Sequence, residues 1–109
     1  MKSKTEIIEK LSELKPILSK KYNVKTIGLF GSFSDETFND KSDIDLLVEL
    51  NKPNGWDIIS LEIFLEEVFN RKIDLVTKNA IREPLRNSIY SNIQFIWYWK
   101  KKNAHLKSI

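Results

Sequence analysis

The segment from Ser42 to Val48 constrains the fold of this chain most, because it alternates short polar side chains with branched apolar ones. Successive side chains of an extended strand point to opposite faces, so Asp43 and Asp45 share one face and the apolar residues occupy the other. Like charges this close repel each other, and a divalent cation beside them reverses the balance. The segment therefore predicts a half-buried strand with a magnesium site on its polar face.

Helical and extended patterns follow one another along the chain. Residues 3 to 6 have the spacing of a capping box. The apolar periodicity then predicts helices at about 4–20, from 56 or 57 to 70 and within 80–88, and strands at 26–30, 43–50 and 72–76. The aromatic segment 93–99 favours an edge strand, although a C-terminal helix fits nearly as well. This order predicts an α/β or α+β fold, with helices on one face of a sheet and the carboxylates on the open face.

The composition limits the kind of site that the chain can build. Its 109 residues suit one domain spanning 1–109, and 41% hydrophobic with 30% charged residues is ordinary for a globular protein. The chain has no cysteine and one histidine, His105, so disulfides and cysteine-based zinc sites are excluded and a metal must use oxygen ligands. No apolar signal region and no apolar stretch long enough to cross a bilayer is present, so we expect a soluble cytoplasmic protein.

Lysines crowd the C-terminal end at positions 100, 101, 102 and 107, within a net charge of +3. A basic tail at about 100–109 can favour nucleic acid or an acidic protein partner. A solvated chain end is the more common reason for such a composition. We therefore expect no direct nucleic-acid binding, and a small nucleic-acid-binding domain is the least favoured function.

A glycine-serine turn precedes the paired carboxylates. Gly31 follows an apolar run and permits a close approach that a side chain would block, while Ser32 can open a helical turn whose amides and hydroxyl grip phosphate. Nucleotidyl transfer uses two metal ions roughly 3.5 to 4 Å apart, and carboxylates supply their bridging ligands. Asp74 can join Asp43 and Asp45 if the third predicted strand pairs beside the second. This combination predicts magnesium-dependent chemistry on a nucleoside triphosphate.

Each of these residues also has a purely structural interpretation. Ser32 can cap a short helix, and Asp74 can pair with Lys72 or Arg71 at the surface. Trp56 is expected to pack beneath the helix that follows it, with nucleotide stacking as the minority interpretation.

Together these residues resemble the minimal nucleotidyltransferases of the polymerase-β-like superfamily. The likeness rests on Gly31-Ser32, on a carboxylate twelve residues later, on segment 42–48 and on segment 71–77, and it covers about residues 5–90. It implies a small mixed sheet of about four strands flanked by helices. It also implies two Mg²⁺ ions, ATP as the substrate, and a catalytic and metal-binding triad of Asp43, Asp45 and Asp74.

Many proteins of this family are antitoxins paired with a HEPN-domain toxin ribonuclease. The resemblance therefore implies transfer of AMP from ATP to a tyrosine hydroxyl of a HEPN partner, which silences the toxin. The alternative is an antitoxin of weak or absent catalysis that neutralises its partner by binding alone. Sequence leaves open the nucleotide, the acceptor, the number of groups transferred and the oligomeric state.

The predicted phosphate-binding loop departs from the family pattern. The family commonly carries an Arg-Gly pair after Gly-Ser, whereas this chain has Asp35 and Glu36 at the matching positions. At an effective dielectric near 20, a unit charge about 4 Å away is worth roughly 4 kcal/mol, so two anions facing the site would weaken triphosphate binding. We expect either that they point away or that activity is reduced. Lys41 is the predicted replacement cation in the nucleotide site, and Arg82 or Arg86 could serve instead.

Overall fold

The computed structural model describes residues 3–52, 55–80, 83–91 and 93–97. Arg82, the end of the aromatic segment and the lysine-rich tail at 100–109 lie outside these residues. Of the helices within the described ranges, none combines the length and the apolar character that a bilayer span requires.

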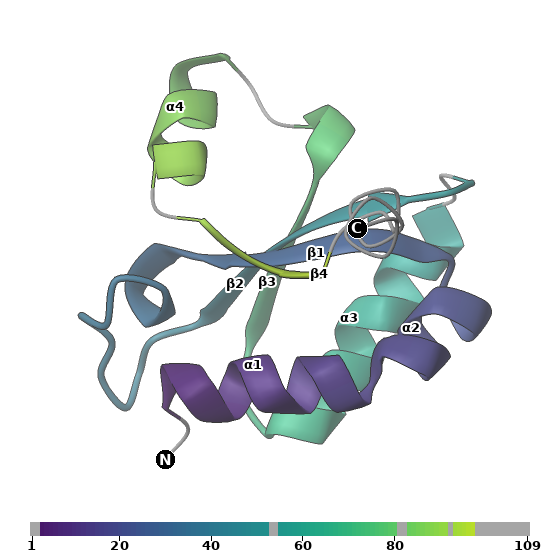
Figure 1. The fold of residues 1–109 in the computed structure, drawn as a ribbon, viewed down its shortest axis with the longest axis horizontal. Coiled ribbons are helices and arrows are strands. Elements are labelled where there is room, and N and C mark those ends of the chain that lie inside the picture. The colour runs from purple at the N-terminus through teal and green to yellow at the C-terminus, as the bar shows by residue number, and fades with distance from the viewer. Residues whose placement is uncertain (1–2, 53–54, 81–82, 92, 98–109) are drawn as a thin grey trace, which may run out of the picture.

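Four strands form one mixed sheet in the order β3-β2-β1-β4 (Figure 1). The strand β1 (Val24–Phe30) pairs antiparallel with both β2 (Ile44–Leu50) and β4 (Gln94–Trp97). The strand β3 (Ile73–Thr77) pairs parallel with β2. The mixed four-stranded sheet confirms the predicted fold. It also answers the question left open at the end of the chain, because the aromatic segment begins as an edge strand.

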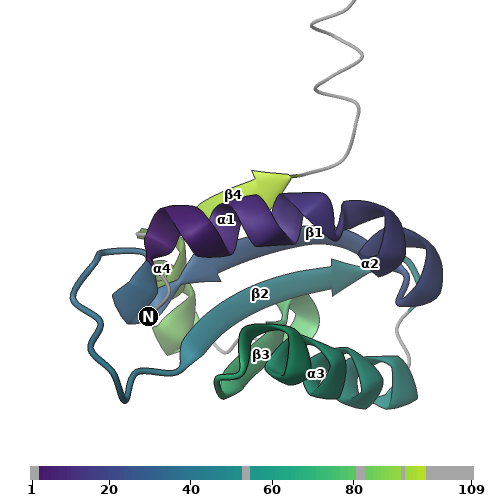
Figure 2. The ribbon, with the colours of Figure 1, turned by 90° about the horizontal axis from the view of Figure 1, so that it is seen from below.

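Three helices cover one face of this sheet, as Figure 2 shows: α1 (Lys4–Glu13), α2 (Lys15–Lys21) and α3 (Gly55–Phe69). Their apolar stripes pack on the sheet and form the main core, whose fully buried members include Ile7, Leu11, Leu18, Ile27, Leu46, Leu61 and Leu65. The strand β2 sends its even-numbered residues into this core, while Asp45 and Glu49 point to the other face. The period of two in the sequence therefore assigned the faces of β2 correctly.

The N-terminal helix differs from its prediction in one respect. The capping box is present, because Glu6 N donates to Ser3 Oγ (3.1 Å) and Ser3 N donates to Glu6 Oε1 (2.8 Å). The single helix expected at 4–20 is broken into α1 and α2 at Leu14. Pro16 explains the break, since it has no amide to donate and its ring clashes with the carbonyl four residues earlier in a continuous helix.

The second face of the sheet is less open than the sequence predicted. The helix α4 (Glu83–Ser91) lies on it, opposite the other three helices (Figure 1). Ile89 of α4 packs on Leu47 of β2, which is 3% exposed, and Phe30, Val76 and Ile93 join this small second cluster. The sequence correctly placed a short helix in this region, but did not indicate the face that it covers.

The connection between β1 and β2 contains a buried aromatic pair that the sequence analysis missed. A 3₁₀ turn, η1 (Gly31–Phe33), follows β1 directly. Phe33 is fully buried, and its ring stacks on that of Phe38 with centroids 4.2 Å apart. The residues of segment 32–42 are mostly polar, and these two rings anchor the segment to the core.

The prediction for Trp56 was wrong. This side chain lies at the start of α3 and is 77% exposed, instead of packing beneath the helix. Ile59 and Ile63, which follow it at helical spacing, are 49% and 54% exposed. The helix α3 therefore turns an apolar stripe outward in addition to the one that it buries.

Candidate active site

The centre of the candidate site is a pair of carboxylates on adjacent strands. Asp45 of β2 and Asp74 of β3 are direct partners in the register of the parallel pair, so both point to the face opposite the main core. Neighbouring strands lie about 4.8 Å apart, which brings the two side chains within contact. The sequence predicted this pairing on the condition that β3 lay beside β2, and the structure meets that condition.

The electrostatics of Asp45 reflect this crowding. Its pKa rises from 3.8 to about 6, first because the carboxyl is partly buried, and then because of the charge of Asp74, a side-chain hydrogen bond with Asp74, and the charge of Asp43. Asp43 stands half-buried immediately before β2. The structure therefore pairs Asp45 with Asp74 and places Asp43 close enough for its charge to act on Asp45.

The glycine-serine turn lies directly against this carboxylate pair. Gly31 has a φ of +75°, a conformation that side chains rarely adopt, and a β-carbon at this position would collide with Asp45 Oδ2. Only glycine fits both the backbone angle and the close approach. Ser32 is the second residue of the same 3₁₀ turn and is partly exposed. The predicted phosphate-binding turn and the predicted metal ligands therefore occupy one small region.

The two anions that replace the family's Arg-Gly pair have an exposed position in the loop. Asp35 Oδ1 accepts hydrogen bonds from Thr37 N (3.1 Å) and Thr37 Oγ1 (2.6 Å), so this carboxylate is engaged within its own turn. Glu36 adopts a φ of +63° at the same turn. The charges that raise the pKa of Asp45 come from other residues, namely Asp74 and Asp43.

The cations that were predicted to replace the family's arginine are Lys41, Arg82 and Arg86. Lys41 is exposed in the turn before Ser42, where its backbone amide donates to Asn39 Oδ1 (2.8 Å). Its role in nucleotide binding stays a prediction. Arg86 is exposed on α4, and Arg82 lies outside the described residues.

The donor chemistry of this region fits magnesium, which prefers carboxylate and phosphate oxygens and keeps several waters. A divalent cation beside Asp45 would favour its charged form and so lower its pKa. Within the described residues, no group of three or more histidine, aspartate or glutamate side chains is placed so that it could hold a metal ion. The role of Asp43, Asp45 and Asp74 as ligands of such an ion, together with substrate oxygens, therefore stays a prediction.

Sequence reasoning missed one further residue of this region, Arg71. It was considered only as a surface partner of Asp74, but its Nη1 donates instead to the carbonyl of Ser42 (2.7 Å), next to Asp43. Because this bond uses a carbonyl, which every residue possesses, no sequence motif could have indicated it.

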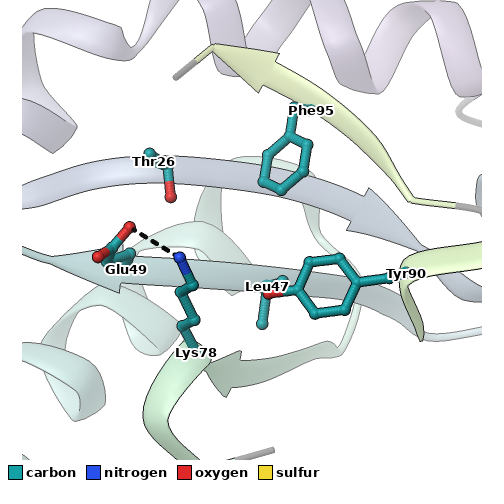
Figure 3. Close-up of a pocket in the computed structure, with 6 residues that line it drawn as sticks. All are labelled: Thr26, Leu47, Glu49, Lys78, Tyr90 and Phe95. Atoms are coloured by element: carbon teal, nitrogen blue, oxygen red, sulfur yellow. Dashed lines mark ion pairs between the residues drawn. The ribbon is translucent and has the colours of Figure 1, made fainter. Parts of the chain in front are cut away.

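A pocket lies over the same face of the sheet, and Figure 3 shows the residues that line it. The residues that line it come from β1, β2, β4, α4 and the 3₁₀ turn that follows β3: Thr26, Leu47, Glu49, Lys78, Tyr90 and Phe95. Glu49 Oε1 forms an ion pair with Lys78 Nζ (3.8 Å) at its edge. Glu49 is four residues beyond Asp45, about 13 Å along the strand, with the buried Leu47 between them. The pocket is therefore separate from the candidate site.

Comparison with known proteins agrees with this geometry. Residues 11–96 match the nucleotidyltransferase domain family. A proposed protein adenylyltransferase of Methanocaldococcus jannaschii is 40% identical over 98 residues, which cover 88% of this chain and all of that protein.

Two solved structures share the fold. A proposed minimal nucleotidyltransferase superposes with a TM-score of 0.71 at 21% identity, over 85% of this chain and 95% of that one. A complex of a tri-AMPylated Shewanella oneidensis HEPN toxin with its MNT antitoxin gives a TM-score of 0.61 at 22% identity, over 88% of this chain and 77% of the matched chain. At these identities the two matches establish the fold.

Proposed function

Since this chain belongs to the nucleotidyltransferase domain family, we propose that it is a magnesium-dependent protein adenylyltransferase that transfers AMP from ATP to a hydroxyl of a partner protein. The observation that carries the proposal is the meeting of Asp45, Asp74 and the Gly31 turn on one face of the sheet. The 40% identical relative, itself a proposed protein adenylyltransferase, supports AMP as the transferred group. The proposal places the reaction in the cytoplasm.

The chemistry is a displacement at the α-phosphorus of ATP. The oxygen of the acceptor hydroxyl forms a bond to this phosphorus, the bond to the β-phosphate breaks, and pyrophosphate leaves. Two magnesium ions, when bound, align the reacting oxygens and neutralise the developing charge. In the proposal, Asp43 and Asp45 would hold the ion that carries the triphosphate and would help to hold the second ion, for which Asp74 would be a further ligand.

The residues of the chain have further tasks in this reaction. The carboxylate of Asp74 accepts the proton of the acceptor hydroxyl, which makes the oxygen a better nucleophile. The turn at Gly31 and Ser32 binds the β- and γ-phosphates, and Lys41 adds a positive charge from the same loop. Because Gly31 packs directly on Asp45, a triphosphate bound at the turn places its α-phosphorus near the carboxylates.

The partner in this proposal is a HEPN-domain toxin, and the chain is its antitoxin. The support is the fold match with an MNT antitoxin in complex with a tri-AMPylated HEPN toxin. Transfer of AMP would add a charged group to a toxin hydroxyl and so block its activity.

A second candidate function is an antitoxin that neutralises its partner by contact alone. The observation that favours it is the pair of anions, Asp35 and Glu36, in place of a cation in the loop. The hydrogen bonds from Thr37 to Asp35 weaken this argument, because they engage the carboxylate away from any phosphate.

The decisive experiment follows the label from two forms of ATP. The protein is incubated with Mg²⁺, the HEPN protein encoded beside it, and ATP labelled at either the α- or the γ-phosphate. We expect transfer from the α-labelled form only, and transfer from the γ-labelled form would indicate a kinase instead. No transfer from either form, in Mg²⁺ or Mn²⁺, would contradict the enzymatic proposal.

Two variants separate catalysis from binding. Asp45→Asn should abolish transfer, whereas Asp40→Asn removes an exposed carboxylate from the neighbouring loop and should transfer normally. Both are then tested for neutralisation of the toxin in cells. If Asp45→Asn protects as well as the parent, contact alone suffices and the second candidate function is correct.

A further inference from the structure

The guanidinium of Arg71 contacts both ends of the loop that joins β1 to β2, and the residue itself lies just before β3. The residue sits between α3 and β3, three positions before Asp74. Its Nη1 donates to three successive parts of the β1–β2 loop, the carbonyls of Asn39 (3.5 Å), Asp40 (3.2 Å) and Ser42 (2.7 Å). The shortest of these bonds is to the residue that immediately precedes Asp43.

The same guanidinium also contacts the other end of the loop. Its central carbon lies 5.1 Å from the centroid of Phe33, the last residue of the 3₁₀ turn that begins at Gly31. Phe33 is fully buried and stacks on Phe38, so this end of the contact is rigid. One side chain therefore bridges the glycine-serine turn and the backbone that carries Asp43.

A backbone hydrogen bond joins the start of β3, the strand that carries Asp74, to the residue that follows Asp43. The carbonyl of Lys72, the residue after Arg71, accepts a hydrogen bond from Ile44 N (3.0 Å). Residues 71 and 72 thus fasten both sides of Asp43, by a side chain before it and by a backbone carbonyl after it. The start of β3, which also carries Asp74, is the common support.

We infer that Arg71 is a positioning residue, which fixes Asp43 and the Gly31-Ser32 turn relative to the pair of Asp45 and Asp74. The inference rests on the proposed function, because it assigns the arrangement of that site to a residue outside it. Asp43 is the one carboxylate of the three that lies outside the sheet, so strand pairing alone does not hold it.

Arginine suits this task and lysine does not. The planar guanidinium offers several N–H donors in a fixed fork and can stack on an aromatic ring at the same time. A lysine ammonium is a compact charge on a flexible chain, so it can keep the charge and donate to carbonyls but has no planar face to stack on Phe33 at the same time. The substitution Arg71→Lys therefore removes the geometry while it preserves the charge.

The experiment compares Arg71→Lys with the adjacent control Lys72→Met. The control removes an exposed charge at the same strand entrance but leaves the backbone carbonyl of residue 72 in place. Three quantities are measured: thermal unfolding, Mg²⁺ affinity by calorimetry without nucleotide, and the rate of AMP transfer. For Arg71→Lys we expect a loss of about tenfold or more in Mg²⁺ affinity and in transfer, as is typical when the support of metal ligands is removed. Lys72→Met should match the parent.

A readout without metal, nucleotide or partner keeps the inference separate from the proposed function. Hydrogen exchange of the loop amides, including Ser42 N, which donates to Asn39 O (3.1 Å), should accelerate in Arg71→Lys. Parental exchange rates and parental Mg²⁺ affinity in Arg71→Lys would overturn the inference, even if the parent protein transfers no AMP. If Arg71→Lys fails to fold, Arg71→Gln replaces it, since its amide keeps an N–H donor group but neither the guanidinium fork nor its planar stacking on Phe33, and the same outcomes apply.

Discussion

Gly31 lies so close to Asp45 that a β-carbon at position 31 would collide with Oδ2 of the carboxylate. The contact joins the end of β1 to the polar face of β2, and β2 in turn pairs with β3. A side chain introduced at position 31 would therefore displace the carboxylate of Asp45, whose atoms are the nearest to it.

The first prediction concerns Gly31→Ala. The β-carbon would meet Asp45 and the backbone at a φ of +75° would be strained, so we expect a loss of about 1 to 3 kcal/mol in the free energy of unfolding and loss of AMP transfer. Urea denaturation and the transfer assay measure the two effects. The control is Gly28→Ala on the same strand, where the added atom meets chiefly the flexible end of Ile93. That variant can lose stability but should still transfer AMP when folded.

The second prediction is a pH dependence of stability. In the metal-free protein Asp45 has a pKa of about 6, above its ordinary 3.8, so the folded state holds this proton more tightly than the unfolded chain does. The tighter binding of this proton contributes its full stabilisation of the folded state below about pH 4, and this contribution is lost as the pH rises through about 6. Asp45→Asn cannot ionise, and should therefore exceed the parent by about 1 kcal/mol at pH 8, after allowance for solvent screening. Urea unfolding in EDTA at pH 4 and pH 8 measures the difference, and an equal difference at both values would contradict the assignment.

The third prediction separates the causes of that pKa. Asp74→Asn removes the negative charge beside Asp45 and exchanges one acceptor oxygen for an amide donor, which favours the ionised form, so the pKa of Asp45 should fall toward 3.8. Burial, the largest cause, stays in place and keeps the value above the ordinary one. Carbon-detected NMR titration of the carboxyl group measures the shift. Glu49→Gln, a neutralisation four residues further along β2, serves as the control and should leave the Asp45 pKa unchanged.

The fourth prediction tests the N-terminal capping box. Ser3→Ala removes the acceptor for the amide of Glu6 and should lower the free energy of unfolding by about 1 kcal/mol. Ser19→Ala, an exposed substitution within α2, should change it by less than about 0.5 kcal/mol. Thermal denaturation of both variants checks this, and similar effects of the two substitutions would show that the cap does not stabilise α1.

Local periodicity explains why much of the fold could be predicted. The alternation at 43–48 identified the buried face of β2, and the spacing of Ser3 and Glu6 identified the helix start, because both depend only on neighbours in sequence. Pro16 is the sequence signal for the break between α1 and α2, and the apolar repeat that continues on both sides of it conceals the break. Trp56 was misplaced because apolar character alone does not determine which face of a helix is covered.

The sequence predicted which carboxylates belong to the candidate site, but it did not predict the contacts that hold the surrounding segments in place. Asp45 and Asp74 belong to strands whose patterns could be recognised, and the parallel pairing then brought them together. The covering of the polar face by α4 depends on tertiary packing of Ile89 on Leu47, which no local pattern specifies. The bonds of Arg71 to backbone carbonyls likewise have no signature in the identity of the residues that accept them.

The parallel register of β2 and β3 determines whether Asp45 and Asp74 can lie side by side. Because side chains alternate between the two faces, a slip of one residue would turn Asp74 toward the apolar core and separate it from Asp45. The helix α3 connects these two strands and packs on the far side of the sheet through Leu61, Leu65 and Phe69. An insertion or deletion within α3 that shifts the register would separate the two carboxylates although it changes neither of them. We therefore expect the length of this helix to vary less among homologues than the length of the surface loops.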